Sequence, residues 1–265
     1  MPALITGTRL AGALALLCTL LGAPAHADIY SEAVAHAGRP AADVSRDSLD
    51  HPAEVLRLAR IGRGMKVADF LAGDGYYSQL LSYVVGPKGH VYLLNNDAYD
   101  KWTNNEWQVR LTAGRLPNVE HRSVNLQYLG LPAHSLDAVL MVKVYHDLYW
   151  QPEQGPWPKI DPDAVLSEIA RVLKPGGTLL LVDHAAKPGS GTSVAGTLHR
   201  MDEEYARRDF EKHGFRLIAT SNLLRHADDP RDMITFKGEM LGKTDRFVMV
   251  FRRQAVPKAA PRRRR

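Results

Sequence analysis

A strand that runs into a glycine turn and then a helix is the feature that most constrains this chain. Residues 67–71 are apolar apart from Asp69, as in a central parallel strand covered on both faces. Gly73 and Gly75 follow at once and permit a tight turn whose backbone amides face a ligand. Apolar residues then recur with helical spacing over 77–84. The pattern predicts an α/β domain that binds its ligand beyond the carboxyl ends of the strands.

The two ends of the chain are expected to lie outside the folded domain. Arg9 precedes an apolar run over 10–21, and Ala25-His-Ala27 resembles a cleavage site, so residues 1–27 are predicted to be a secretory signal peptide. Cys18, the only cysteine, falls within it. A mature chain without thiols suits an oxidising compartment, and we expect the periplasm. The segment 255–265 is predicted to be a disordered basic tail.

The charge of the chain argues against nucleic acid as a partner. The formal net charge is +5, but basic and acidic residues are equal at 29 each once Arg9 and Arg262 to Arg265 are set aside. A neutral folded part lacks the basic surface that phosphate backbones require. We expect a small-molecule substrate and no stable membrane insertion, and the oligomeric state stays open.

Strands and helices alternate along the rest of the chain. Residues 28–50 read as an extended arm or short helix, and 51–254 as one domain. Asp161 and Pro162 are typical of a helix start, and Pro175-Gly-Gly177 of a helix end. We predict a Rossmann-like, seven-stranded, mostly parallel sheet with helices on both faces. Its further strands are expected at 90–94, 119–125, 136–144, 178–182, 215–224 and 246–252, and further helices at 102–111 and 202–213.

Several motifs give the chain from about 53 to 252 a family resemblance. Asp69-Phe-Leu-Ala-Gly-Asp-Gly75 and Arg171-Val-Leu-Lys-Pro-Gly-Gly177, at this strand spacing, resemble the class I S-adenosylmethionine-dependent methyltransferases. Shorter segments are similar to exported bacterial proteins described as predicted methyltransferases. These are Tyr145-His-Asp-Leu148, Asp183-His-Ala-Ala186, Leu198-His-Arg200 and Gly242-Lys-Thr-Asp245.

The resemblance implies a cofactor, S-adenosylmethionine, and the residues that hold it. The strand carboxylate, Asp69, is expected to bind the cofactor ammonium beside Gly73, Asp74 and Gly75. Asn95 stands where the family has an acid for the ribose hydroxyls, and Asn125 where a polar group meets the adenine. Leu71 replaces the first glycine of the family loop. Its side chain is expected either to crowd the backbone approach or to point into the core.

Residues able to carry chemistry follow the later strands. One hypothesis is O- or N-methylation, in which His146 or His184 removes a proton from the acceptor and Asp147 or Asp183 orients the imidazole. His199 joins this catalytic set, and Arg200 is expected to hold an anionic acceptor through bidentate bonds.

Two other interpretations remain open. The histidines and aspartates can instead bind a divalent metal such as zinc, but no close His-x-x-x-His spacing supports this, and no metal ligands are assigned. The alternative function is a non-catalytic periplasmic ligand-binding protein that kept the fold and lost or exchanged the cofactor.

Overall fold

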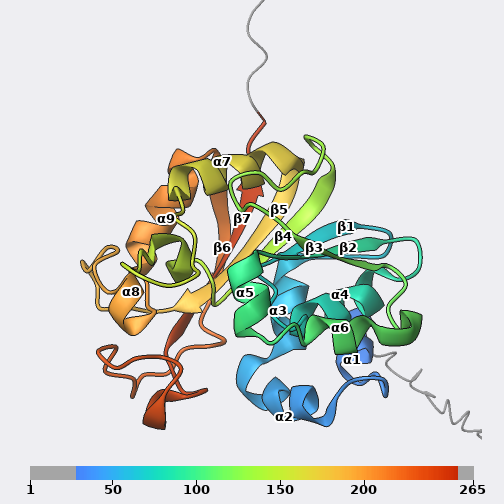
Figure 1. Cartoon of the computed structure of the whole chain (residues 1–265), viewed down its shortest axis with the longest axis horizontal. Coiled ribbons are helices and arrows are strands. Elements are labelled where there is room, and N and C mark those ends of the chain that lie inside the picture. The colour runs from blue at the N-terminus through green and yellow to red at the C-terminus, as the bar shows by residue number, and fades with distance from the viewer. Residues whose placement is uncertain (1–27, 256–265) are drawn as a thin grey trace, which may run out of the picture.

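Seven strands pair into one sheet in the order β3-β2-β1-β4-β5-β7-β6 (Figure 1). Only β7 runs antiparallel to its neighbours. The predicted fold class is therefore confirmed. The computed structural model describes residues 28–255, so the predicted signal peptide and residues 256–265 of the predicted tail lie outside the described part. The strands are β1 (Lys66–Phe70), β2 (His90–Asn95), β3 (Val119–Ser123), β4 (Leu136–Val142), β5 (Leu173–His184), β6 (Phe215–Ser221) and β7 (Arg246–Arg253).

Helices connect the strands and precede the first of them. The predicted start of the helix after β4 is confirmed, because Asp161 accepts a hydrogen bond from the Ala164 amide and Pro162 is the first helical residue. The α-helices are α1 (Ile29–Val34), α2 (Ala41–Asp50), α3 (Pro52–Ala59), α4 (Tyr76–Val85), α5 (Asp97–Trp102), α6 (Trp107–Leu111), α7 (Pro162–Val172), α8 (Ala195–Leu198) and α9 (Glu203–Lys212). Short 3₁₀ turns are η1 (Thr112–Gly114), η2 (His146–Tyr149) and η3 (Gly238–Met240).

The helix predicted over 102–111 is wrong. Asn104 and Asn105 both adopt the left-handed conformation, with φ of 51° and 54°. Asparagine tolerates this conformation better than most residues, so the pair divides the segment into α5 and α6. Asn96 caps α5 by accepting the Tyr99 amide at 2.8 Å, and the helix starts at Asp97, five residues earlier than predicted.

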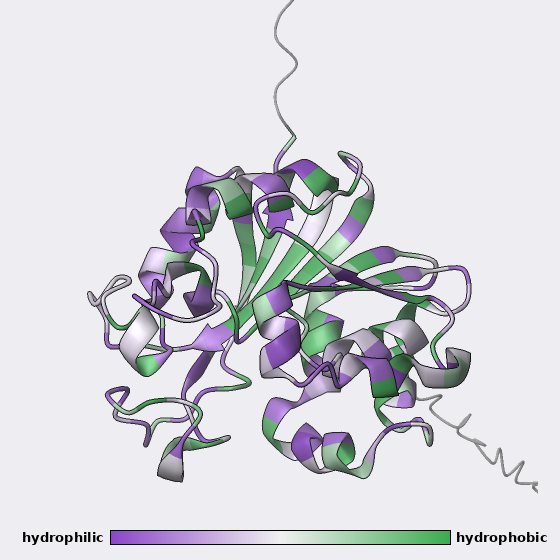
Figure 2. Cartoon of the chain, viewed as in Figure 1, coloured by the Kyte–Doolittle hydropathy of each residue, from purple (hydrophilic) through white to green (hydrophobic). Residues whose placement is uncertain are grey.

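Two apolar cores cover the two faces of the sheet. α7 and α9 pack on one face through side chains such as Val165, Ile169 and Phe210. α1, α3 and α4 pack on the other through Leu56, Leu80 and their neighbours. Figure 2 accordingly shows the strands as the most hydrophobic part of the chain and the outer helix surfaces as polar. Of residues 28–255, no helical stretch has the length and apolar character that a bilayer crossing needs.

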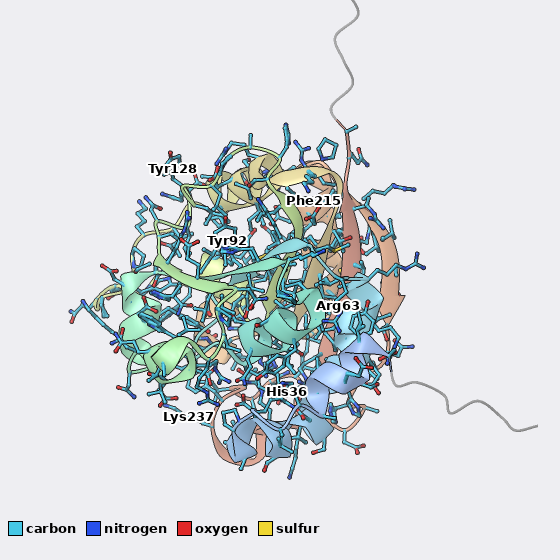
Figure 3. The ribbon with its side chains drawn as sticks, turned by 90° about the vertical axis from the view of Figure 1, so that its right-hand side faces the viewer. His36, Arg63, Tyr92, Tyr128, Phe215 and Lys237 are labelled. Atoms are coloured by element: carbon cyan, nitrogen blue, oxygen red, sulfur yellow. The ribbon has the colours of Figure 1, made fainter. Side chains whose placement is uncertain are left out.

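The arm before the domain is ordered and bound to it. The His36 ring, near the amino-terminal helices in Figure 3, stacks on Tyr83 of α4 at 3.8 Å between centroids. The Tyr30 hydroxyl donates to the carbonyl of Ile61 at 2.9 Å. The arm therefore forms two short helices, one of which, α2, reaches the glycine loop.

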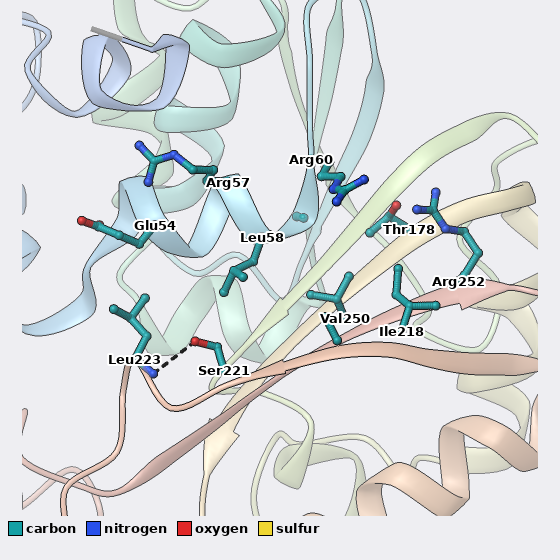
Figure 4. A pocket seen from close by; sticks show the side chains of 12 residues that line it. Glu54, Arg57, Leu58, Arg60, Thr178, Ile218, Ser221, Leu223, Val250 and Arg252 are labelled. Atoms are coloured by element: carbon teal, nitrogen blue, oxygen red, sulfur yellow. Dashed lines mark hydrogen bonds between the residues drawn. The ribbon is translucent and has the colours of Figure 1, made fainter.

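A groove of about 540 Å³ lies between α3 and the β6–β7 strands (Figure 4). Leu58, Ile218 and Val250 line it, with Arg57 and Arg252 at its edges. None of the residues predicted to bind a cofactor or react belongs to it. The predicted site residues instead follow the carboxyl ends of the strands.

The side chain of Leu71 points away from the glycine loop and into the core. It has a φ of 51°, the conformation natural to the glycine it replaces, and its side chain is 2 % exposed in the core under α7. The second of the two expectations is thus confirmed, since the side chain points into the core. A side chain in the left-handed conformation costs roughly 1–2 kcal/mol, which core burial must offset.

We predict an inverted order of stability at this position. Leu71→Ala should lose about 2–5 kcal/mol of core packing and keep the left-handed strain. Leu71→Gly loses the same packing but removes the strain, so it should be more stable than Leu71→Ala by about 1 kcal/mol, although glycine usually destabilises. Urea unfolding of the three proteins measures this. An alanine variant more stable than the glycine variant would contradict it.

Candidate functional site

The glycine loop between β1 and α4 is closed by its own hydrogen bonds. The amides of Ala72, Gly73, Gly75 and Tyr76 donate to Leu94 O, Asn95 Oδ1, Ala72 O and Asp74 Oδ1. The prediction that the loop amides face a ligand is therefore wrong for these four groups. The loop instead fixes how β1 enters α4.

Gly75 is required by packing. Its φ is 88°, and a Cβ at this position would lie 2.8 Å from Leu93 Cδ1 on β2. Gly73 has a φ of 62°, and a Cβ there would make ordinary contacts with Tyr99 and Thr103. The predicted tight turn is present, and its second glycine lets α4 approach β2 closely.

Asn95 holds the loop from the end of β2. Its Oδ1 accepts the Gly73 amide at 3.0 Å, and its Nδ2 donates to Gly73 O at 2.9 Å and to Asp100 at 2.7 Å. The residue is fully buried. Both hydrogens of its amide are thus used inside the protein, which disfavours the predicted bond to ribose hydroxyls. Asp100 also pairs with His121 on β3 at 3.0 Å.

Asp74 and α2 are joined through one guanidinium. Arg110 bonds the carboxylates of Asp74 and Asp43 at 2.7 and 2.6 Å, the Asp74 carbonyl at 2.7 Å and Gln79 at 2.6 Å. The Tyr76 hydroxyl donates to Asp47 of α2 at 2.6 Å. These bonds fasten α2 over the loop, and they give Asp74 a structural partner in place of the predicted cofactor contact.

Asn125 lies apart from these groups. The residue is exposed beyond the end of β3, and its Oδ1 accepts the amide of Gln127 at 3.0 Å. Its predicted contact with adenine stays a prediction.

Asp69 is a buried carboxylate with no cation bonded to it among the described residues. It is 3 % exposed, and the Ser78 hydroxyl donates to it at 2.7 Å. Burial raises its pKa to about 7, and the Ser78 bonds offset this only in part. At neutral pH the folded chain therefore pays a desolvation cost that an added cation would relieve.

Asp183 and His146 form the second part of the site, at the ends of β5 and β4. His146 Nδ1 lies 2.7 Å from Asp183 Oδ1, and its backbone amide donates to Asp183 Oδ2 at 2.8 Å. Asp183 has no exposed surface. Of the two carboxylates considered for orienting the imidazole, Asp183 makes this bond, and it fixes the ring so that Nε2 is directed away from β5.

Asp147 and His199 approach the other nitrogen of this ring. Asp147 Oδ1 is 3.4 Å from His146 Nε2 and 3.5 Å from His199 Nδ1. His199 ends α8 with a φ of 53°. Aromatic rings stand around it, with Phe236 at 4.7 Å and Trp150 at 5.6 Å between centroids. The structure therefore brings four predicted catalytic residues together across separate segments of the chain.

The two histidines predicted as proton acceptors differ in charge. Burial lowers the pKa of His146, but Asp183 and Asp147 outweigh burial and raise it to about 9. His184 is bonded to the Thr244 hydroxyl at 2.7 Å, and burial together with the nearby charge of His146 holds its pKa well below the ordinary value. At neutral pH, His184 is therefore the uncharged imidazole of the two.

The prediction that Arg200 binds an anionic acceptor is wrong. Its guanidinium is fully buried, donates to both oxygens of Asp229 at 2.7 and 3.0 Å, and reaches the carbonyls of Ala185 and Met233. Asp229 lies in the segment between β6 and β7, so Arg200 anchors that segment to β5. The local sequence Leu198-His-Arg200 does not indicate that Arg200 pairs with Asp229, which lies far along the chain.

Two residues at this edge were missed by the sequence analysis. Tyr99 of α5 lies close to Asp147, Asp69 and Asp183. Burial and the charges of these three carboxylates raise the pKa of its hydroxyl. Lys143 directly follows β4, and its Nζ donates to Asp50 of α2 at 3.1 Å. The sequence position of Lys143, directly after a parallel strand, could have identified it as a residue of this edge. Nothing comparable in the sequence marks Tyr99.

The comparisons with known proteins agree with this arrangement. A family described as a methyltransferase domain matches residues 68–181. The solved structure of a SAM-dependent methyltransferase from Aquifex aeolicus shares the fold, with a TM-score of 0.55, 21 % identity, and coverage of 80 % of this chain and 98 % of that one. The family match, the curated relatives and the shared fold support the class I SAM-dependent methyltransferase superfamily.

Curated relatives match about half of this chain. The ubiquinone/menaquinone biosynthesis C-methyltransferase UbiE of Saccharophagus degradans is 27 % identical over 128 residues, which is 48 % of this chain and 46 % of that protein. The demethylmenaquinone methyltransferase of Listeria monocytogenes is 31 % identical over 135 residues, 49 % of each. The chain spans about half the length of the curated relatives it matches. The [4+2]-cyclase SpnF has the same fold, with a TM-score of 0.55 and 14 % identity over 84 % of this chain and 86 % of its own.

The methyltransferase domain implies S-adenosylmethionine, and part of the site fits it. This cofactor carries an ammonium and a sulfonium, and Asp69 offers a buried carboxylate without a bonded cation. Asp147 and Asp183 add negative charge near Tyr99. The fit is electrostatic and concerns the methionine end of the cofactor. It does not extend to the ribose, because Asn95 is already hydrogen-bonded to the loop.

We predict that Asp69→Asn stabilises the protein in a pH-dependent way. A carboxyl whose pKa is raised on folding, here from 3.8 to about 7, contributes stability that is full below pH 3.8 and lost as the pH rises through 7. Asparagine does not ionise, so the advantage of the variant should grow by about 3 kcal/mol between pH 5 and pH 8. Urea unfolding at both pH values measures it, and a difference that does not change with pH would contradict the assignment.

Proposed function

We propose that this protein is an S-adenosylmethionine-dependent methyltransferase that acts on a small molecule. The observation that carries the proposal is the buried Asp69 carboxylate at the end of the first strand of a methyltransferase domain, with a serine hydroxyl as its bonded side chain. A cationic amino acid group is the ligand that relieves the cost of this burial. The cofactor supplies an electrophilic methyl group when it is bound.

The acceptor is proposed to lie beside the histidines. Methyl transfer depends mainly on alignment of the acceptor with the methyl group, and a neutral imidazole then takes the acceptor proton. His184 suits this step because it is uncharged at neutral pH. Trp150 and Trp157, 5.4 Å apart, provide apolar surface for the acceptor.

The acceptor atom is proposed to be oxygen or nitrogen. A base beside the acceptor is useful for hydroxyl and ammonium groups, which must lose a proton. The UbiE relatives are named C-methyltransferases, so methylation of an activated ring carbon is the outcome that would replace this part of the proposal.

The protein is also proposed to be exported and to act in the periplasm. Arg9, the apolar run over 10–21 and Ala25-His-Ala27 support a cleaved leader.

We predict that the chain without residues 1–27 binds S-adenosylmethionine with a micromolar or lower dissociation constant by titration calorimetry. Asp69→Asn should weaken binding by at least about tenfold, because the neutral amide loses the charge that pairs with the ammonium. His134→Ala, at the amino end of β4 on the opposite edge, should bind as the unchanged protein does. No heat at millimolar ligand would refute the proposal.

A turnover measurement then tests the acceptor. With methyl-deuterated S-adenosylmethionine and a panel of phenols, amines and quinols, we expect labelled O- or N-methyl products. His184→Ala should retain cofactor binding and lose turnover by a factor of about 100, in the range typical of a removed general base. If the label were found only on ring carbon, the proposal of O- or N-methylation would be overturned. The proposal of methyltransferase activity would remain.

A second candidate function is favoured by one specific observation. Four amides of the loop and the amide side chain of Asn95 are satisfied within the chain. Such a loop is stable without a ligand, as expected of a binding protein that kept the fold and lost the cofactor. The absence of S-adenosylmethionine binding in the titration supports that alternative.

A further inference from the structure

Three potential metal ligands converge at the end of β4. His146, Asp147 and His199 each offer one ligand atom, and these three atoms all lie within 4.8 Å of one another. The distances from the Asp147 oxygen to the two imidazole nitrogens, 3.4 and 3.5 Å, are longer than ordinary N···O hydrogen bonds. The Asp147 oxygen thus lies near both imidazoles without being closely bonded to either.

These separations match the edges of a tetrahedral coordination shell. Nitrogen and oxygen ligands of zinc lie about 2.0–2.2 Å from the ion, and tetrahedral geometry then sets them about 3.3–3.6 Å apart. Both measured separations fall in this range. The two imidazole nitrogens lie within 4.8 Å of each other, and a tetrahedral shell requires them to be about 3.3–3.6 Å apart as well.

The group behind His146 also suits a metal site. Asp183 holds the Nδ1 atom of His146 at 2.7 Å, which leaves Nε2 for the ion. A carboxylate on the second nitrogen is the usual partner of a metal-bound histidine, because it fixes the ring and increases its basicity. His146 and Asp147 are 4 % and 7 % exposed, so competition from bulk water is limited.

We propose that His146, Asp147 and His199 bind one divalent transition-metal ion, with Zn²⁺ as the most suitable, and leave its fourth position open. Two imidazoles and one carboxylate disfavour Mg²⁺ and Ca²⁺, which prefer shells made of oxygen alone. Three protein ligands with an open position are the pattern of catalytic rather than structural zinc. The sequence analysis assigned no metal ligands because these residues come from η2 and the end of α8, which are far apart in the chain.

A second cluster of similar composition provides a contrast. Asp163, Asp209 and His213 also lie close together, but Asp163 is 60 % exposed and bonded to Lys212 at 2.9 Å. Asp209 accepts the hydroxyls of Tyr145 and Tyr149. Its carboxylates are already engaged, so this cluster is the internal control.

The open coordination position could bind the methyl acceptor, a role that rests on the proposed function. A hydroxyl or phenol oxygen of the acceptor bound to the ion would lose its proton more readily to His184, the base proposed above. The oxygen would then form the bond to the methyl group as the methyl–sulfur bond of the sulfonium breaks and S-adenosylhomocysteine leaves as the neutral thioether. The aromatic rings at Phe236 and Trp150 then bury the rest of the acceptor. Metal binding itself does not depend on this use.

The test begins with protein that lacks residues 1–27, stripped with chelator and titrated with Zn²⁺ and with Co²⁺. We expect one ion per chain, and visible Co²⁺ absorption of the intensity typical of four-coordinate sites. Asp147→Asn and His199→Ala should abolish the tight site, and Asp183→Asn should weaken it by about 10–100-fold. Circular dichroism confirms that each variant is folded.

Matched controls decide the outcome. Asp163→Asn in the second cluster and His134→Ala at the opposite edge should leave stoichiometry and affinity unchanged. Absence of a tight site, or a site equally strong in His199→Ala, would overturn the proposal, as would loss in Asp163→Asn alone. Because S-adenosylmethionine titration is a separate measurement, failure of metal binding is distinguishable from failure of the transferase function.

Discussion

Buried negative charge at the carboxyl edge of the sheet is the constraint on which the rest of this site depends. Asp69 lies near the carboxyl end of β1 and Asp183 near that of β5, on either side of β4, and both are almost inaccessible to water. Asp183 is compensated by three donors, the ring and amide of His146 and the amide of His184. Asp69 has a serine instead, and its pKa rises accordingly. The difference marks Asp69 as the group that gains from a cationic ligand.

The basic residues near this edge are engaged elsewhere. Arg110 joins α2 to the glycine loop, Arg200 anchors the segment before β7, and Arg246 and Lys143 both pair with Asp50 at the end of α2. Removing one member of such a buried pair leaves an uncompensated charge, so these contacts are expected to be sensitive to substitution. The arm and the loops are thereby held in place by cations, while the centre stays acidic. An acidic centre with a rigid frame suits a cofactor or ion that carries positive charge.

The sequence predicted the sheet because hydrophobic periodicity and glycine placement are local signals. Asp161 with Pro162, and the turn at Gly73 and Gly75, appear as predicted for this reason. Side-chain partners were harder to predict, because they depend on residues far apart in the chain. Arg200 looked like an acceptor ligand until Asp229 was placed beside it, and Asn95 like a ribose ligand until its bonds to Gly73 were known. The approach of His199 to Asp147 depends on α8 packing near η2, which no local pattern encodes.

The central claim is that the Asp69 carboxylate accepts the cationic end of S-adenosylmethionine. Its most direct test is the pH dependence of binding by titration calorimetry, run between pH 6 and pH 7.5 in buffers of different ionisation enthalpy. Because the carboxyl has a pKa of about 7 without ligand, affinity should rise with pH and binding should release a proton, and both effects should vanish in Asp69→Asn. Binding that is independent of pH, or proton release that persists in Asp69→Asn, would contradict the account.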